Sequence, residues 1–90
     1  MTEENKSAPA GDMRIMIEQI AKALVDDPAQ VSVNPVEEDG ETVLELTVGP
    51  NDLGRVIGKQ GRTAKSIRTI LNAVASRTNR KVVLEIIEER

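Results

Sequence analysis

The chain has 90 residues, of which 39% are hydrophobic and none is aromatic, so one small domain with an aliphatic core is expected. It contains no cysteine and no histidine, which excludes disulfides, thiolate chemistry and the commonest metal ligands and general bases. No apolar run approaches the roughly 18 residues of a membrane span, and the polar, acidic N-terminus is unlike a signal peptide. We therefore expect a cytoplasmic protein that needs no cofactor or metal.

Charge is distributed unevenly along the chain, although the net charge is only −3. The segment 55–81 contains no acidic residue and eight basic ones: Arg55, Lys59, Arg62, Lys65, Arg68, Arg77, Arg80 and Lys81. The remaining residues carry a net charge of −11. Because salt screens charges beyond about 8 Å, a local basic surface can bind a polyanion even on an acidic protein. A solvated helix face balanced by acids elsewhere explains the segment equally well on charge alone.

The N-terminal residues 1–11 are polar, which predicts a disordered tail in front of a domain over residues 12–90. Asp12 is the expected N-cap of the first helix. Apolar residues then recur at helical spacing as far as Leu24. The helix is expected to end near Asp26, because a proline follows shortly after.

Two runs of alternating apolar residues predict an antiparallel pair of strands over residues 31–36 and 43–48. The Asp39-Gly40 dipeptide between them is a strong signal for a tight turn. Pro35 lacks a backbone donor, so the first strand is expected at an edge of the sheet or to end there. Gly49-Pro50 ends the second strand.

Two helices and a last strand are predicted in the second half of the chain. Asn51 is expected to cap a short helix that stops at Gly58, and a longer helix follows from Arg62 to about Arg77. The longer helix carries its apolar residues on one face: Ala64, Ile67, Ile70, Leu71 and Val74. Its opposite face carries Lys65, Arg68 and Thr69. A third strand is predicted over residues 82–87.

The predicted order of elements is α-β-β-α-α-β, with no internal repeat. Three strands that share one apolar face need helices packed on that face. The expected fold class is therefore α+β, a two-layer α/β sandwich of a three-stranded sheet with helices on one face.

The most informative segment is the turn Gly58-Lys59-Gln60-Gly61 between the two predicted helices. Its glycines permit unusual backbone dihedrals and the close approach of another chain. The helix that starts near Arg62 presents unpaired N–H groups and the positive end of its dipole, which favour anions. Lys59, Arg62 and Arg55 add positive charge, and the basic face of the following helix would extend it. The turn is thus suited to hold consecutive phosphates of a nucleic-acid strand.

Other interpretations of the turn remain. It also fits an ordinary helix–helix connection with Gly58 as a C-cap and Gly61 as a spacer. The long polar residues between the glycines and the basic segment around them favour nucleic-acid binding. A P-loop is excluded because only three residues separate Gly54 from Gly58, and Gln60 follows Lys59.

The stretch from Ile57 to Ile67, IGKQGRTAKSI, resembles the core pattern I-G-x-x-G-x-x-I-K-x-I of KH domains. The predicted order of elements is similar to the type II, prokaryotic form of that fold. Residues 12–89 resemble the KhpA family of small single-KH bacterial RNA-binding proteins. One departure is Ala64, where the pattern has a larger aliphatic residue. The resemblance implies that the glycine loop clamps the backbone of about four single-stranded nucleotides.

The resemblance also implies a set of binding residues and partners. The expected RNA-binding residues are those of the loop and its surroundings: Arg55, Ile57, Gly58, Lys59, Gln60, Gly61, Arg62, Lys65 and Arg68. Ile57 and Ile67 would form an apolar floor for the RNA, although Ile67 fits the core equally well. The implied protein is an RNA chaperone or post-transcriptional regulator that acts as a dimer, pairs with a second, Jag-like KH protein and affects cell division and cell shape.

The alternative function is a protein–protein interaction adaptor whose KH-like surface docks a partner protein. No enzyme activity is expected, because the serines have no activating neighbours in the sequence. Without aromatic side chains no base can stack on a protein ring. We therefore expect weak, broad RNA binding that depends on phosphate contacts and is strengthened by dimerisation. Arg77, Arg80 and Lys81 are interpreted as solubilising residues.

Overall fold

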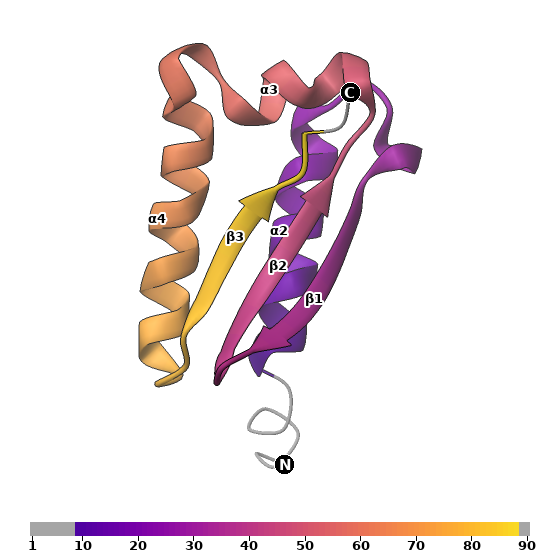
Figure 1. The fold of residues 1–90 in the computed structure, drawn as a ribbon. Coiled ribbons are helices and arrows are strands. Elements are labelled where there is room, and N and C mark those ends of the chain that lie inside the picture. The colour runs from indigo at the N-terminus through magenta and orange to yellow at the C-terminus, as the bar shows by residue number, and fades with distance from the viewer. Residues whose placement is uncertain (1–8, 89–90) are drawn as a thin grey trace.

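The computed structural model describes residues 9–88 as a three-stranded sheet with helices packed on one of its faces (Figure 1). Its helices and strands are α2 (Pro9–Leu24), β1 (Ser32–Glu38), β2 (Glu41–Thr47), α3 (Leu53–Ile57), α4 (Arg62–Arg77) and β3 (Val82–Ile86). Short 3-10 turns lie between them: η1 (Pro28–Gln30), η2 (Pro50–Asp52) and η3 (Lys59–Gly61). The predicted α+β class and α-β-β-α-α-β order are confirmed. No helix within residues 9–88 is long and apolar enough to cross a membrane.

The first helix begins earlier than the sequence predicted. Pro9 is its first residue, and a proline is favoured there because the first helical N–H needs no partner. Asp12 is therefore not the N-cap; it lies in the first turn, where a carboxylate interacts favourably with the helix dipole. Of the predicted tail over residues 1–11, residues 1–8 lie outside the described part of the chain.

β1 and β2 form the predicted antiparallel hairpin, with Glu38 opposite Glu41. Asp39 and Gly40 make the turn with φ values of 52° and 80°, which is the backbone that a two-residue hairpin turn requires. The strand order β1-β2-β3 places β1 at an edge, where Pro35 costs the sheet no hydrogen bond. The sequence signals for this hairpin are confirmed.

β3 pairs in parallel with β2, so the sheet is mixed. α3 and α4 form the connection that leads the chain from β2 to β3, its neighbour in the sheet (Figure 1). Helices and sheet enclose one aliphatic core whose members are Met13, Ile17, Ala21, Val31, Val33, Leu44, Leu46, Val48, Val56, Ile67, Leu71, Ala75, Val82 and Leu84. No aromatic residue is needed to fill it.

α4 has the predicted bounds, but its buried face is turned slightly from the predicted one. The buried residues are Ala64, Ile67, Leu71 and Ala75. Ile70 was predicted on the apolar face, yet 46% of its surface is exposed. Because α4 packs against β3 and α2 along the stripe centred on Leu71, Ile70 is left beside that stripe, facing solvent.

Candidate nucleic-acid interface

The Gly58-Lys59-Gln60-Gly61 loop connects α3 to α4 at the end of the molecule opposite the β1–β2 turn (Figure 1). α3 ends where the Gly58 N–H donates to the Gly54 carbonyl at 2.8 Å. Gly58, Gln60 and Gly61 all have positive φ, at 80°, 59° and 75°. The side chains of Lys59 and Gln60 are exposed. The sequence therefore builds a projecting loop rather than one packed against the core.

The C-terminal side of the loop is open to an approaching chain. A Cβ placed on Gly61 would meet nothing within 4 Å. Gly61 is also the N-cap of α4, and no side chain caps this helix. The Arg62 N–H donates to the Lys59 carbonyl, while the dipole of the 16-residue helix directs its positive end toward the loop. An anion over Gly61 would therefore be favoured.

Three of the predicted basic residues surround this loop without a carboxylate partner. Lys59, Arg62 and Lys65 are exposed, and among residues 9–88 no acidic oxygen lies within 4.0 Å of their side-chain nitrogens. The Arg62 Nη2 donates to the Gln60 Oε1 at 3.1 Å, which places this guanidinium against the loop. Their charges are thus available to a polyanion.

Arg55 lies close to the loop but is paired with acids. Its Nη2 donates to the Asp26 Oδ2 at 3.0 Å, and its Nε lies 3.5 Å from the Asp52 Oδ1. These acids offset the positive charge of Arg55, which the sequence predicted to bind RNA. Arg55 is therefore part of an ion-pair cluster between α2 and α3.

Three other basic residues of the segment, Arg68, Arg80 and Lys81, contact the strands of the sheet. Arg68 donates from Nε and Nη2 to the Leu84 carbonyl of β3, each at 3.4 Å. Arg80 and Lys81 form ion pairs with acidic residues of the β1–β2 hairpin. The Arg80 Nη2 lies 3.9 Å from the Glu37 Oε2, and the Lys81 Nζ lies 3.8 Å from the Glu41 Oε1. The basic segment of the sequence is thus divided in the fold, with only its first part around the glycine loop.

The two isoleucines expected to form an apolar floor have different positions. Ile67 is 3% exposed and belongs to the core, whereas Ile57 is half-buried and packs against the core beside the loop. Ala64, the departure from the KH pattern, is 4% exposed. Its small side chain therefore affects the packing of α4 rather than the surface of the loop.

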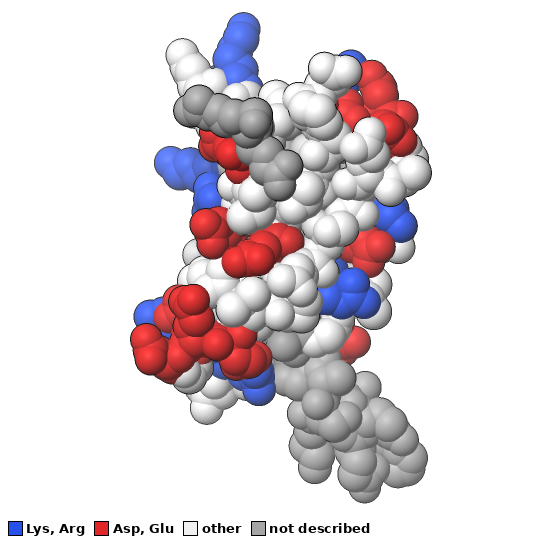
Figure 2. Space-filling model, turned by 45° about the vertical axis from the view of Figure 1, so that its right-hand side comes forward, with Lys and Arg blue, Asp and Glu red and all other residues white. Residues whose placement is uncertain are grey.

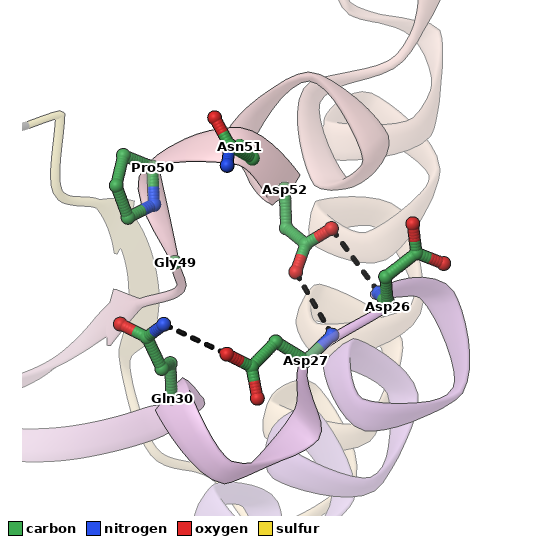
Figure 3. A pocket seen from close by; sticks show the side chains of 7 residues that line it. All are labelled: Asp26, Asp27, Gln30, Gly49, Pro50, Asn51 and Asp52. Atoms are coloured by element: carbon green, nitrogen blue, oxygen red, sulfur yellow. Dashed lines mark hydrogen bonds between the residues drawn. The ribbon is translucent and has the colours of Figure 1, made fainter.

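Asp52 is a structural residue that the sequence did not predict. Asn51 was expected to cap the short helix, but it lies inside η2, and Asp52 precedes the first residue of α3. Asp52 is 3% exposed, and its two carboxylate oxygens accept hydrogen bonds from the backbone N–H groups of Asp26 and Asp27 at 3.1 and 3.0 Å (Figure 3). The role of Asp52 depends on the fold, which places the backbone that follows α2 beside this carboxylate. A pocket of about 280 Å³ borders it, lined by Asp26, Asp27, Gln30, Gly49, Pro50, Asn51 and Asp52.

Acidic side chains gather at the opposite end of the molecule. Figure 2 shows a cluster of carboxylates over the β1–β2 turn and more on the sheet side of the molecule. The turn contributes Glu37, Glu38, Asp39 and Glu41. No group of three or more acidic residues within residues 9–88 is arranged to hold a metal ion. The glycine loop is thus bordered by the cations Lys59, Arg62 and Lys65, while the hairpin turn at the other end of the molecule carries a cluster of acids.

Comparison with known proteins gives a consistent family. Residues 14–86 match the family model described as KhpA/KhpB, KH domain. The chain is 55% identical over 75 residues to the RNA-binding protein KhpA of Clostridium perfringens, covering 83% of this chain and 100% of that protein. It is 50% identical over 76 residues to the RNA-binding protein KhpA of Listeria monocytogenes, covering 84% and 100%. The protein of the same name from Chlamydia trachomatis is 50% identical over 78 residues, covering 87% and 100%.

Proposed function

The chain belongs to the KhpA/KhpB family of KH domains, and we propose that it binds single-stranded RNA by holding the sugar-phosphate backbone at the Gly58–Gly61 loop. The observation that carries this proposal is a set of three cations around a loop with open space over Gly61: Lys59, Arg62 and Lys65, which have no acidic partner among residues 9–88. Relatives that are about half identical are named RNA-binding proteins, which supports RNA as the polyanion. The proposed role is binding, without catalysis.

The proposed contacts divide between backbone and side chains. A phosphate over Gly61 would interact with the first turn of α4 and its dipole. Lys59 and Arg62 would neutralise that phosphate and its neighbour, and Lys65, about one turn along α4 from Gly61, would meet the next. Gln60 supplies an exposed amide for sugar or base edges. Since no aromatic side chain can stack on a base, binding is expected to be broad in sequence.

The proposal extends to assembly. A chain of this size buries only about 60% of its unfolded surface, so self-association is a natural way to cover apolar residues. Ile70 projects from α4 with 46% of its surface exposed, and Val74 is half-buried on the same side. We assign this α4 surface, Ile70 and Val74, to a homodimer contact. Pairing with a second, Jag-like KH protein is proposed through the same surface.

The proposed cellular role is that of an RNA chaperone or post-transcriptional regulator in the cytoplasm, where its RNA ligands are. Two weak backbone clamps held in one dimer would gain affinity by avidity, without requiring a specific base sequence. Such a dimer would hold two single-stranded segments together.

The double substitution Lys59→Asp with Gln60→Asp tests the clamp. Both side chains are exposed, and aspartate tolerates the positive φ of position 60, so the fold is expected to persist. RNA binding, measured by fluorescence polarisation with a labelled oligouridylate, is expected to be lost. The charge control is Lys22→Asp with Gln19→Asp on the exposed side of α2, which makes the same change in net charge. Because Lys22 pairs with Glu18 at 3.2 Å, circular dichroism checks that this variant is folded.

The two variants separate the clamp from general charge repulsion. The clamp predicts loss in the loop variant and only slight weakening in the α2 variant. Undiminished RNA binding by the loop variant would remove the proposal, and the protein–protein adaptor would then be the better account of this surface.

A further inference from the structure

We propose that Asp52 and Arg55 are positioning residues that hold the glycine loop in its RNA-binding geometry without contacting RNA, an inference that rests on the proposed function. The starting point is the length of α3, only five residues (Leu53–Ile57). A helix this short is not stable by itself in water. Its orientation therefore depends on what holds it, and it leads directly into Gly58.

Asp52 fastens the start of α3 to the end of α2. Its carboxylate is 3% exposed and accepts the N–H groups of Asp26 and Asp27 at 3.1 and 3.0 Å, as Figure 3 shows. Hydrogen bonds to an ionised acceptor are about twice as strong as neutral ones. Removing the carboxylate would also leave two backbone donors without their acceptor.

Arg55, three residues after Asp52, adds two ion pairs. Its Nε lies 3.5 Å from the Asp52 Oδ1 and its Nη2 lies 3.0 Å from the Asp26 Oδ2, so α3 contacts the segment after α2 through both residues. Below it, Val56 is fully buried in the core. These contacts hold α3 against the segment that follows α2 and against the core.

The orientation of α3 decides the shape of the loop. The C-terminal side of the loop is fixed by α4, whose Ile67 and Leu71 are buried. The N-terminal side is carried by α3, and Gly58 must also reach its contact with Thr63 in the first turn of α4. If α3 tilts, Gly58 and Lys59 move relative to Arg62. Consecutive phosphates of the RNA then cannot contact Lys59 and Arg62 at the same time. Arg55 and Asp52 thus act on the RNA through α3.

The sign of the expected effect separates positioning from plain electrostatics. Asp52→Asn removes a negative charge close to a site for a polyanion, so Coulomb's law alone predicts tighter RNA binding. Positioning predicts weaker binding, because the asparagine can accept only one of the two N–H groups well. Arg55→Gln separates positioning from a phosphate contact. The loss of one phosphate contact to single-stranded RNA brings the slope of log K against log salt closer to zero by about 0.7. The loss of a positioning residue leaves that slope unchanged.

The test measures the affinity of the full chain for a labelled oligouridylate across a salt series, at a temperature where circular dichroism shows each variant folded. Residues outside a binding site can change coupling enough to give about fivefold to tenfold weaker binding, the result expected for Asp52→Asn. Arg55→Gln should weaken binding about threefold with the wild-type salt slope. Asp39→Asn, the same charge change in the exposed hairpin turn, should leave affinity unchanged.

Each outcome bears on the inference. RNA binding by Asp52→Asn that is as tight as in the wild type, or tighter, overturns it. A salt slope that moves closer to zero by about 0.7 in Arg55→Gln also overturns it. If Asp52→Asn does not fold, Arg55→Gln decides alone, and unchanged affinity overturns the inference. Val33→Ala, a core truncation in β1, is the stability control and should lower the melting temperature while keeping the affinity.

A failure of the proposed function can be told apart from a failure of this inference. If the wild-type chain does not bind RNA, the proposed function fails, and hydrogen exchange at the Gly58 and Gly61 amides then tests positioning. Faster exchange at both amides in Asp52→Asn, but not in Val33→Ala, supports the positioning role. Unchanged exchange overturns it.

Discussion

Gly58 lies so close to Thr63 that a Cβ on the glycine would meet the Thr63 Cβ at 2.6 Å and its backbone nitrogen at 2.8 Å. Gly58 also has φ 80° and ψ 169°, a backbone region that is essentially restricted to glycine. The entrance of the loop is therefore packed directly on the first turn of α4. This contact fixes the distance between the two ends of the loop.

Gly58→Ala is expected to destabilise the fold. The strained backbone alone costs about 1–3 kcal/mol, and the displaced Thr63 adds to it. For a domain of this size each kcal/mol lowers the melting temperature by about 4–8 °C. Thermal unfolding followed by circular dichroism measures the change, and a melting temperature equal to that of the wild type would contradict the contact.

Gly61→Ala is expected to separate binding from stability. Nothing lies within 4 Å of the added Cβ, so the cost is the left-handed backbone alone, about 1 kcal/mol. The Cβ would occupy the space through which the RNA backbone approaches. RNA affinity should therefore fall about tenfold, while the melting temperature falls less than in Gly58→Ala. RNA binding as tight as that of the wild type would show that RNA does not approach over Gly61.

The salt dependence of binding should report the number of neutralised phosphates. Contacts by Lys59, Arg62 and Lys65 predict a slope of log K against log salt near −2, at about 0.7 per phosphate. Lys65→Gln should bring the slope closer to zero by about 0.7. Arg77→Gln, at the far end of α4, should leave it unchanged. A salt-independent affinity of the wild type would rule out a phosphate clamp.

Ile70→Glu is expected to convert the proposed dimer to a monomer, because it places a charge on the exposed α4 surface. Analytical ultracentrifugation measures the mass, and the RNA affinity should fall about tenfold or more as avidity is lost. The control is Ile15→Glu on α2, a residue with a similar exposed fraction of 48%. A dimer that survives Ile70→Glu but not Ile15→Glu would place the contact on α2 instead.

Local sequence patterns predicted those parts of the fold that depend on neighbouring residues. The bounds of α4 follow from helical periodicity between a glycine turn and a polar loop, and they agree with the structure. The hairpin follows from Asp39-Gly40, since both residues adopt the positive φ that such a turn needs. The glycine loop follows from its two glycines and the helices on either side.

The features that the sequence did not predict depend on which distant segments meet. Nothing in the local sequence distinguishes Asp52 from Asn51, because its hydrogen-bond partners after α2 are distant in the sequence. Arg55 reads as a free cation until Asp26, far away in the sequence, becomes its partner. Ile70 falls on the apolar side of the helix, but only the packing of α4 on β3 and α2 determines which part of that side is buried.

An NMR titration of the ¹⁵N-labelled chain with single-stranded RNA tests the central claim most directly, because it reports every backbone amide at once. The clamp predicts that the largest shift changes fall between Gly58 and Lys65, with the amides of β1 and β2 nearly unchanged. Shift changes centred on the sheet, or none at the Gly58–Gly61 loop at saturating RNA, would contradict it.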